Sequence, residues 1–391
     1  MEVLENKYNT IQKILFTITV FVILTRKYTI SMVKEYLVPD NIMSILFYLS
    51  ILLPGIIILL KKKHSLKEVV IIFFSLVLYF FTKEGSILRI VLLAASVIDI
   101  DDEYVIKIYM IASVIFVVMS ILSGNMLDEF VKQPEIHYRF TNGRFVFRET
   151  FGFANPNSVF LFTLPIYAAY IFLRFEKYNW IDRGILFATT IYIYMNTMSR
   201  TGLITALMAL IIVDILRYID LQKHKIYGII IKVTPILFAV GSVLVGTVFS
   251  NISILNDVLA SRPMHWNAYL IEEGNILTLF GNKYSDLVKE IHPLDSSYIY
   301  IIAVLGLCSF VFFMYLLYKG LDEFIKKDNK KYIAIVMMFL VYSIAENILL
   351  EAGYNFTIIL LIKYVMKSSE NEMSILEMIT YLKNKIKRRA V

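Results

Sequence analysis

Charged residues and cysteine are both scarce in this 391-residue sequence. Only 18% of its side chains are charged, against about a quarter in an ordinary soluble domain, and its mean hydropathy is +0.68. The single cysteine, Cys308, lies in an apolar run, so an internal disulfide and a multi-cysteine metal site are both excluded. The composition therefore excludes an ordinary soluble protein and a disulfide-stabilised domain.

The sequence also lacks internal repeats, low-complexity tracts and a separate soluble domain. It has long apolar runs instead, with 58% hydrophobic residues, and many runs are long enough to cross about 30 Å of hydrocarbon as helices. We therefore expect an all-α, polytopic membrane protein that forms a single integral membrane domain over residues 1–391, with about twelve transmembrane helices. The predicted spans are 11–25, 41–60, 68–82, 86–99, 104–122, 157–173, 184–198, 202–218, 228–249, 296–318, 331–349 and 353–366.

Basic residues account for the net charge of +7, and they collect in alternate turns. With the N-terminus in the cytoplasm, the lysine-rich turns near 61–63, 174–183, 217–225 and 319–331 all face the cytoplasm, as the positive-inside rule requires. Both termini are therefore predicted to be cytoplasmic, and no nucleic acid is needed to explain the charge. The basic tail, 368–391, is either an amphipathic helix on the inner leaflet (Met373, Leu376, Ile379, Leu382) or a solvated segment.

This topology leaves two long loops on the outer face, over 123–156 and 251–295, of about 34 and 45 residues. Loops of this length are usually functional or disordered. Both contain several aromatic and large aliphatic residues, which is not typical of disorder. We therefore expect the two loops to form one functional site.

Arginine occurs on the face where the positive-inside rule disfavours it, at positions 139, 144, 148, 200 and 262. A guanidinium offers a planar fork of donors that fits phosphate oxygens. Arg144 and Arg148 would share a helix face if their segment were helical. The alternative for any one arginine is an ion pair with a nearby glutamate or a lipid headgroup.

Two short polar segments stand at predicted helix starts. In FGFANPN, Asn155 is predicted to cap a helix that has Pro156 at its first position and Asn157 just inside. Ser199–Gly202 interrupts an apolar stretch, which indicates either a tight turn or a placement of Arg200 in a polar cavity.

The second loop ends in His292, Asp295, Ser296 and Ser297. Asp295 is a candidate general base or a helix cap, and His292 is the other candidate base. His265 and His292 are too few and too scattered for a metal site, so we predict no metal and no cofactor. Glu346 and Glu351 are expected to pair with the outer arginines.

The order of these features resembles the O-antigen ligase and Wzy polymerase superfamily, from about Arg144 to Gly306 and less clearly to Glu346. The matching elements are Arg148–Asn157 (RETFGFANPN), Ser199–Gly202 (SRTG), Ser261–Trp266 (SRPMHW), Leu279–Gly281 (LFG) and Asp295–Tyr298 (DSSY). In the last of these, Asp295 precedes Gly306 by eleven residues. Each match is short, and their shared order carries the resemblance.

The resemblance implies a GT-C-like fold and a metal-independent glycosyltransferase that acts on undecaprenyl-diphosphate-linked glycans at the outer face of a bacterial cytoplasmic membrane. It implies that Arg148, Arg200 and Arg262, with Arg144 nearby, bind the diphosphate. Asp295 or His292 would orient the acceptor, with Asn155, Asn157, Tyr298 and Glu346 in support. A flippase and a chain-length regulator would be partners.

Ligases of this superfamily typically carry histidine where this sequence has Asp295, which favours a polymerase of capsular or exopolysaccharide repeat units, and Gram-positive capsular polymerases look most similar. A ligase that transfers a finished glycan stays an alternative. So does a lipid-linked glycan flippase or transporter, although these are expected to have symmetric halves and polar groups at the bilayer midplane.

Overall fold

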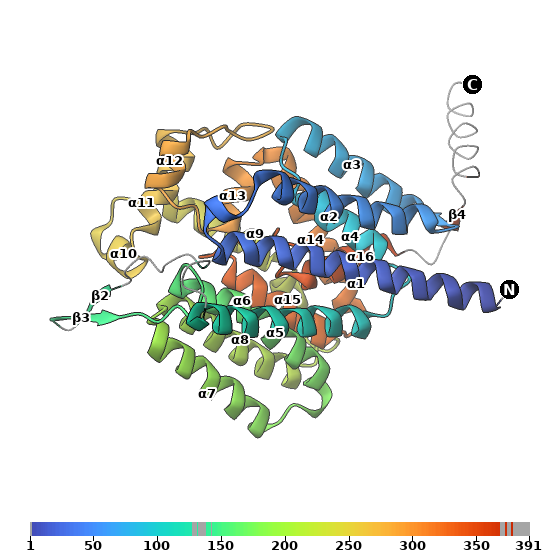
Figure 1. Ribbon diagram of the computed structural model, residues 1–391, viewed down its shortest axis with the longest axis horizontal. Coiled ribbons are helices and arrows are strands. Elements are labelled where there is room, and N and C mark those ends of the chain that lie inside the picture. The colour runs from blue at the N-terminus through green and yellow to red at the C-terminus, as the bar shows by residue number, and fades with distance from the viewer. Residues whose placement is uncertain are drawn as a thin grey trace.

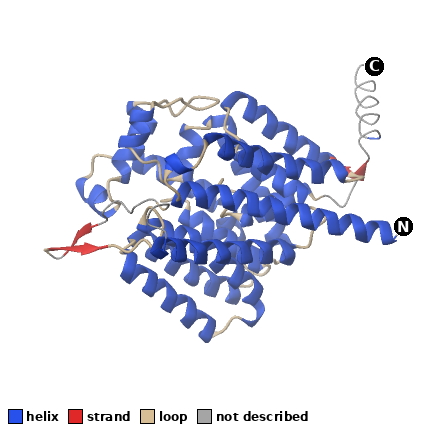
Figure 2. Cartoon of the chain, in the orientation of Figure 1, coloured by secondary structure: helices blue, strands red, loops and turns tan. Residues whose placement is uncertain are grey.

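The computed structural model describes residues 2–126, 131, 138–141, 143–367, 372–373 and 377, and this part of the chain is mostly helical (Figures 1 and 2). The first half contains α1 (Glu2–Met32), α2 (Asp40–Leu60), α3 (Leu66–Thr82), α4 (Ser86–Ser96), α5 (Asp102–Met126), α6 (Pro156–Arg174), α7 (Trp180–Thr197) and α8 (Arg200–Tyr218). The second half contains α9 (Lys225–Thr247), α10 (Ser253–Val258), α11 (Arg262–Asn267), α12 (Asp286–Ile291), α13 (Ser297–Ala303), α14 (Gly306–Lys326), α15 (Lys330–Tyr342) and α16 (Phe356–Met366).

Within the described residues, six helices are long and apolar enough to cross a membrane. They are Tyr8–Met32, Asp40–Leu60, Asp102–Gly124, Pro156–Lys177, Arg200–Tyr218 and Lys225–Thr247. Two shorter apolar helices are Ser86–Ser96 and Phe356–Met366. The protein is therefore a multi-pass membrane protein. Each of the twelve predicted ranges overlaps a helix, but 331–349 is too long, because α15 ends at Tyr342. A count of twelve membrane spans stays a prediction.

The long helices run roughly along the long axis of the molecule, with the N-terminus at one end (Figure 1). The short helices α10, α11 and α12 cluster at the other end, together with a hairpin formed by β2 (Tyr138–Thr141) and β3 (Arg144–Phe147). Both predicted long loops thus lie at the same end of the helical bundle. Near the opposite end, β1 (His64–Ser65) pairs with β4 (Glu372–Met373).

The core of the bundle is formed by α15 and α16. From Tyr332 to Tyr342 every residue of α15 is buried, and so is nearly all of α16. A helix that is apolar on all sides is covered either by other helices or by lipid. Here α8 and α6 pack on α15, while α4 and α14 pack on α16.

One predicted helix is two helices. The segment 296–318 is interrupted between α13 and α14, where Gly306 has φ of +84°. The amides of Leu307 and Cys308 donate to the carbonyls of Thr278 (2.9 Å) and Leu279 (3.0 Å) instead of continuing the helix. A Cβ on Gly306 would lie 2.2 Å from the backbone nitrogen of Gly281, so this contact requires glycine.

The first long loop also differs from the prediction. Arg144 begins strand β3, whose partner is β2, so Arg144 and Arg148 do not share a helix face. The second loop contains α10, α11, a π-helical turn (Ala268–Glu272) and α12. In the tail, Met373 lies in β4 and not in a helix. Leu376, Ile379 and Leu382 lie outside the described residues.

Candidate active site

The two long loops meet on the turn between α7 and α8. From the first loop, Arg148 donates through Nε to the carbonyl of Thr197 (2.7 Å), and the amide of Glu149 donates to Asn196 (2.8 Å). From the second loop, Arg262 donates through Nη1 to Oγ1 of Thr201 (3.3 Å). Both loops therefore bind to the junction of α7 and α8, where Arg200 is the first residue of α8.

The FGFANPN segment fixes the position of Arg148. Asn155 caps α6 by accepting a hydrogen bond from the amide of Asn157, and Pro156 is at the first helical position, as predicted. Asn157 in turn accepts a hydrogen bond from Nη2 of Arg148 (2.7 Å). Gly152, with φ of +85°, packs directly against the backbone of α5. A Cβ at this position would lie 2.0 Å from the carbonyl oxygen of Ser120, so the close contact requires glycine.

Arg262 is positioned by a tight turn. Ser261 has φ of +61° and starts α11, with Pro263 in its first turn. Oδ1 of Asn256 accepts the amide of Met264 (3.2 Å), which satisfies one of the free donors at this helix start. The buried Trp266 holds the other side of α11 against Gly246 of α9.

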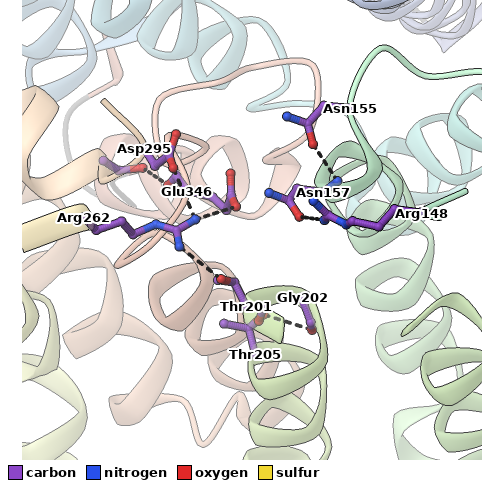
Figure 3. A network of polar contacts seen from close by, with 10 residues as sticks. Arg148, Asn155, Asn157, Thr201, Gly202, Thr205, Arg262, Asp295 and Glu346 are labelled. Carbon is purple, nitrogen blue, oxygen red and sulfur yellow. Dashed lines mark hydrogen bonds and ion pairs between the residues drawn. The ribbon is translucent and has the colours of Figure 1, made fainter. Parts of the chain in front are cut away.

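Arg262 lies between two carboxylates (Figure 3). Its Nη2 is 3.2 Å from Oδ2 of Asp295 and 3.5 Å from Oε1 of Glu346. The residue is only 9% exposed, and its Nε has no hydrogen-bond partner within the described part of the chain. In the view of Figure 3, Arg148 approaches from the opposite side, and Glu346 and Asn157 lie between the two arginines.

One guanidinium for two carboxylates leaves an excess of negative charge that a proton can offset. Burial raises the pKa of Asp295, and the adjacent Arg262 opposes this increase. Burial, followed by the charge of Asp295, raises the pKa of Glu346 to about 8, again against the effect of Arg262. Of the two carboxyls, Glu346 is therefore the one that favours holding a proton at neutral pH, next to the contact between Arg262 and Asp295.

The two loop histidines contact each other. Nδ1 of His265 lies 3.2 Å from Nδ1 of His292, so one ring donates while the other accepts. Burial lowers the pKa of His265, with further effects of His292 and Arg262. The hydroxyl of Tyr269 donates to the backbone carbonyl of His292 (2.8 Å). Within the described residues, no three His, Cys, Asp or Glu side chains gather in a metal-ligand arrangement.

An open groove of about 490 Å³ is lined by Arg262 and Arg200. Away from the arginines its walls are mostly apolar and come from α8, α9 and α15, with Ile204, Met208, Leu237 and Phe238 among them. Arg200 is exposed and is the first residue of α8. The groove thus has two guanidinium groups beside mostly apolar walls, whereas the sequence suggested a tight turn or a polar cavity for Arg200.

Several predicted site residues have other positions. Arg144 is exposed on β3, in a hairpin that extends beyond the helices in Figure 1, so it does not join the cluster. Tyr298 is fully buried, and its hydroxyl donates to the carbonyl of Leu340 (3.1 Å), which makes it a core residue. Asp295 does not cap α13, because Ser296 does. Glu351 pairs with Lys27 (2.9 Å) and Arg89 (3.9 Å) and not with an outer-loop arginine.

Two residues of the site were not expected from the sequence. The hydroxyl of Ser297 donates to the backbone carbonyl of Glu346 (2.8 Å) and accepts the amides of Ile348 and Leu349. It therefore fixes the segment that presents Glu346. Thr201 orients Arg262. Their residue types did not distinguish them as site residues, because Ser and Thr at the start of a helix ordinarily act as caps.

No protein-family model, curated protein or solved structure matches this chain.

Proposed function

We propose that this protein is a metal-independent glycosyltransferase that polymerises undecaprenyl-diphosphate-linked oligosaccharide repeat units at the outer face of a bacterial cytoplasmic membrane. The observation that carries the proposal is Arg262, held between Asp295 and Glu346 at the end of an apolar groove that Arg200 also lines. A lipid diphosphate has the same two parts, an apolar chain and a compact anion.

The charges of the site fit a diphosphate leaving group. With a proton on Glu346, the charges of Arg262 and Asp295 balance, and Arg200 in the groove and Arg148 in the first loop add positive charge. Guanidinium groups aimed at the bridging oxygen stabilise the negative charge that develops when the bond to the sugar breaks. This electrostatic stabilisation is what a divalent cation supplies in other enzymes.

The proposed reaction is a single displacement at the anomeric carbon of the donor sugar. The hydroxyl oxygen of the acceptor attacks this carbon as the bond to the diphosphate oxygen breaks, and the electron pair leaves with undecaprenyl diphosphate. The hydroxyl proton passes to Asp295 or to His292. We favour Asp295, because it lies beside Arg262, whereas the ring of His292 is paired with His265.

The proposal also includes a membrane topology and two partner proteins. We propose about twelve membrane spans in a GT-C-like arrangement, both termini in the cytoplasm, and the two loops outside. A flippase would deliver the substrate, and a chain-length regulator would act on the product.

The test is deletion of the gene in its host, followed by separation of lipid-linked and surface glycans by size. A polymerase predicts single repeat units in place of long polymer, restored by wild type but not by Arg148→Ala, Arg262→Ala or Asp295→Ala. Arg183→Ala is the matched control, because Arg183 also pairs with an aspartate (Asp214, 2.7 Å) but lies at the α7 start, away from the site. Long polymer that stays on its carrier would indicate a ligase, and single units confined to the cytoplasmic face a flippase.

A further inference from the structure

A second cavity, of about 540 Å³, adjoins the candidate active site from another side. Its wall includes Leu294 and Asn347, whose chain neighbours Asp295 and Glu346 contact Arg262. The apolar groove is lined instead by Ile344, Ala345 and Arg262. The segment from Ile344 to Asn347, which contains Glu346, therefore lines the groove at one end and this second cavity at the other.

The lining of the second cavity differs in kind from that of the groove. It is polar and aromatic, with the rings of Tyr269, Tyr284 and Tyr300 and the amides of Asn282 and Asn347. Rings offer flat apolar faces for the C–H faces of sugars, and amides hydrogen-bond to hydroxyl groups.

The aromatic wall is rigid. The hydroxyl of Tyr284 donates to the carbonyl of Tyr269 (2.7 Å), and their ring centroids are 4.6 Å apart. Nδ2 of Asn282 donates to the carbonyl of Ala303 (3.0 Å), which ties the wall to α13. A preformed wall of this kind loses little conformational entropy when a ligand binds.

The cavity also has an excess of positive charge. Lys83, Lys283 and Lys289 line it, and Lys289 is also paired with Asp286 (3.0 Å). The one lining carboxylate is Glu84, near the hydroxyl of Tyr300 (3.4 Å). Lys83 ends α3 with φ of +60°, a conformation that favours glycine, so this lysine is held there at a conformational cost. The three lysines still outnumber the two nearby carboxylates, Glu84 and Asp286, and this excess of positive charge indicates an anionic ligand.

We propose that this cavity binds a sugar unit with a carboxylate or phosphate group, as part of the acceptor oligosaccharide. The acceptor role rests on the proposed polymerase function, because it needs Asp295 to lie between acceptor and donor. The binding of an acidic oligosaccharide does not rest on it and is tested separately.

The experiment uses the purified full-length protein in lipid nanodiscs. The probes are oligosaccharides from partial hydrolysis of the host's surface polysaccharide, before and after chemical removal of their acidic groups, and farnesyl diphosphate for the arginine groove. The variant is the triple substitution Lys83→Gln, Lys283→Gln and Lys289→Gln. Its matched control replaces three exposed lysines elsewhere, Lys62, Lys177 and Lys223, by glutamine.

We expect the triple variant to lose about tenfold or more in affinity for the acidic oligosaccharides, while the control triple binds them as wild type does. Affinity for the neutralised oligosaccharides and for farnesyl diphosphate should stay unchanged. Equal binding of acidic and neutralised probes to the wild type, or wild-type affinity in the triple variant, overturns the proposal. So does equally strong competition by inorganic phosphate, which would indicate a general anion site.

The two proposals fail in different ways. If cells that lack the gene still make polymer but the lysine variant binds acidic sugar weakly, the polymerase assignment is wrong and the acidic-sugar site stands. If Arg262→Ala abolishes polymer while the lysine variant binds acidic sugar normally, the site assignment is wrong and the polymerase stands.

Discussion

Arg262 and Asp295 form an ion pair, with Nη2 of the arginine 3.2 Å from Oδ2 of the aspartate. Arg262 begins α11, and Asp295 stands just before Ser296, the cap of α13. The pair therefore ties an early part of the second loop to its end. It also places the guanidinium of Arg262, which fits phosphate oxygens, beside the carboxyl of Asp295, the proposed proton acceptor.

Replacement of Arg262 tests the proposed diphosphate contact. Arg262→Ala should lower the rate of polymer formation by about 10²–10³-fold, because it removes charge stabilisation and leaves Asp295 and Glu346 facing each other. Arg262→Lys should recover only part of this loss, since an ammonium lacks the planar fork. The measurement is conversion of labelled lipid-linked repeat units to polymer. Rates within a factor of about two of wild type for Arg262→Ala would remove Arg262 from the mechanism.

The raised pKa of Glu346 predicts a pH dependence. Below about pH 8 Glu346 is protonated; above it, the side chain ionises and repels the diphosphate. Activity should then fall by up to about tenfold per pH unit. Glu346→Gln, which is neutral at every pH, should keep its activity at alkaline pH. An identical alkaline decline in Glu346→Gln would show that another group titrates.

The same shift has a defined effect on stability. Between pH 4.5, the ordinary pKa of Glu346, and about pH 8, the folded state holds a proton that the unfolded state has released. The free energy of unfolding should therefore decrease as the pH rises through this range. Glu346→Gln should flatten that slope. Thermal unfolding of both proteins in the same detergent, at pH values across the range, provides the comparison.

The apolar groove predicts a steric effect that spares the diphosphate contact. A Cβ on Gly241 of α9 would meet no atom within 4 Å, and Gly241 lines the groove, so Gly241→Leu should fill it. We expect about a tenfold loss in affinity for farnesyl diphosphate and no change for inorganic pyrophosphate. Gly55→Leu in α2, which also meets open space, is the control. Unchanged binding of farnesyl diphosphate would mean that its lipid lies elsewhere.

The contact between Gly281 and Gly306 predicts a stability effect. A Cβ on Gly281 would lie 1.9 Å from the carbonyl oxygen of Val304, and both glycines have positive φ. Either change to alanine should lower the free energy of unfolding by about 2 kcal/mol or more. Gly184→Ala in α7 meets open space and should be neutral or stabilising. Differential scanning fluorimetry ranks the three variants, and equal melting temperatures would contradict the prediction.

The half-buried ion pairs of Glu351 predict sensitivity to charge removal. Burial favours its neutral form, but Lys27 and Arg89 outweigh this effect and lower the pKa of Glu351. Glu351→Gln leaves Lys27 and the buried Arg89 without their counter-ion, and should cost about 3 kcal/mol or more. Glu103→Gln removes one carboxylate of an exposed pair with Lys107 and should change stability by less than about 1 kcal/mol. Equal losses in the two variants would count against this role.

The sequence by itself determined the positions of the helices and their local start signals. Apolar runs and lysine-rich turns located every long helix, and the cap by Asn155 with Pro156 followed from local chemistry. These features depend on residues within a few positions of each other, so a linear reading is sufficient. The candidate arginines could also be identified from the sequence, because each one lies in a loop or turn predicted to be on the outer face of the membrane.

The tertiary structure alone decided which of these residues meet. The pairing of Arg262 with Asp295 and Glu346, the assignment of Glu351 to Lys27 and Arg89, and the exclusion of Arg144 all depend on how distant segments pack. The break at Gly306 likewise arises because its neighbours' amides bond to Thr278 and Leu279. Ion-pair partners and backbone contacts of this kind act over a few ångströms in space, and sequence spacing does not encode that distance across loops of this length.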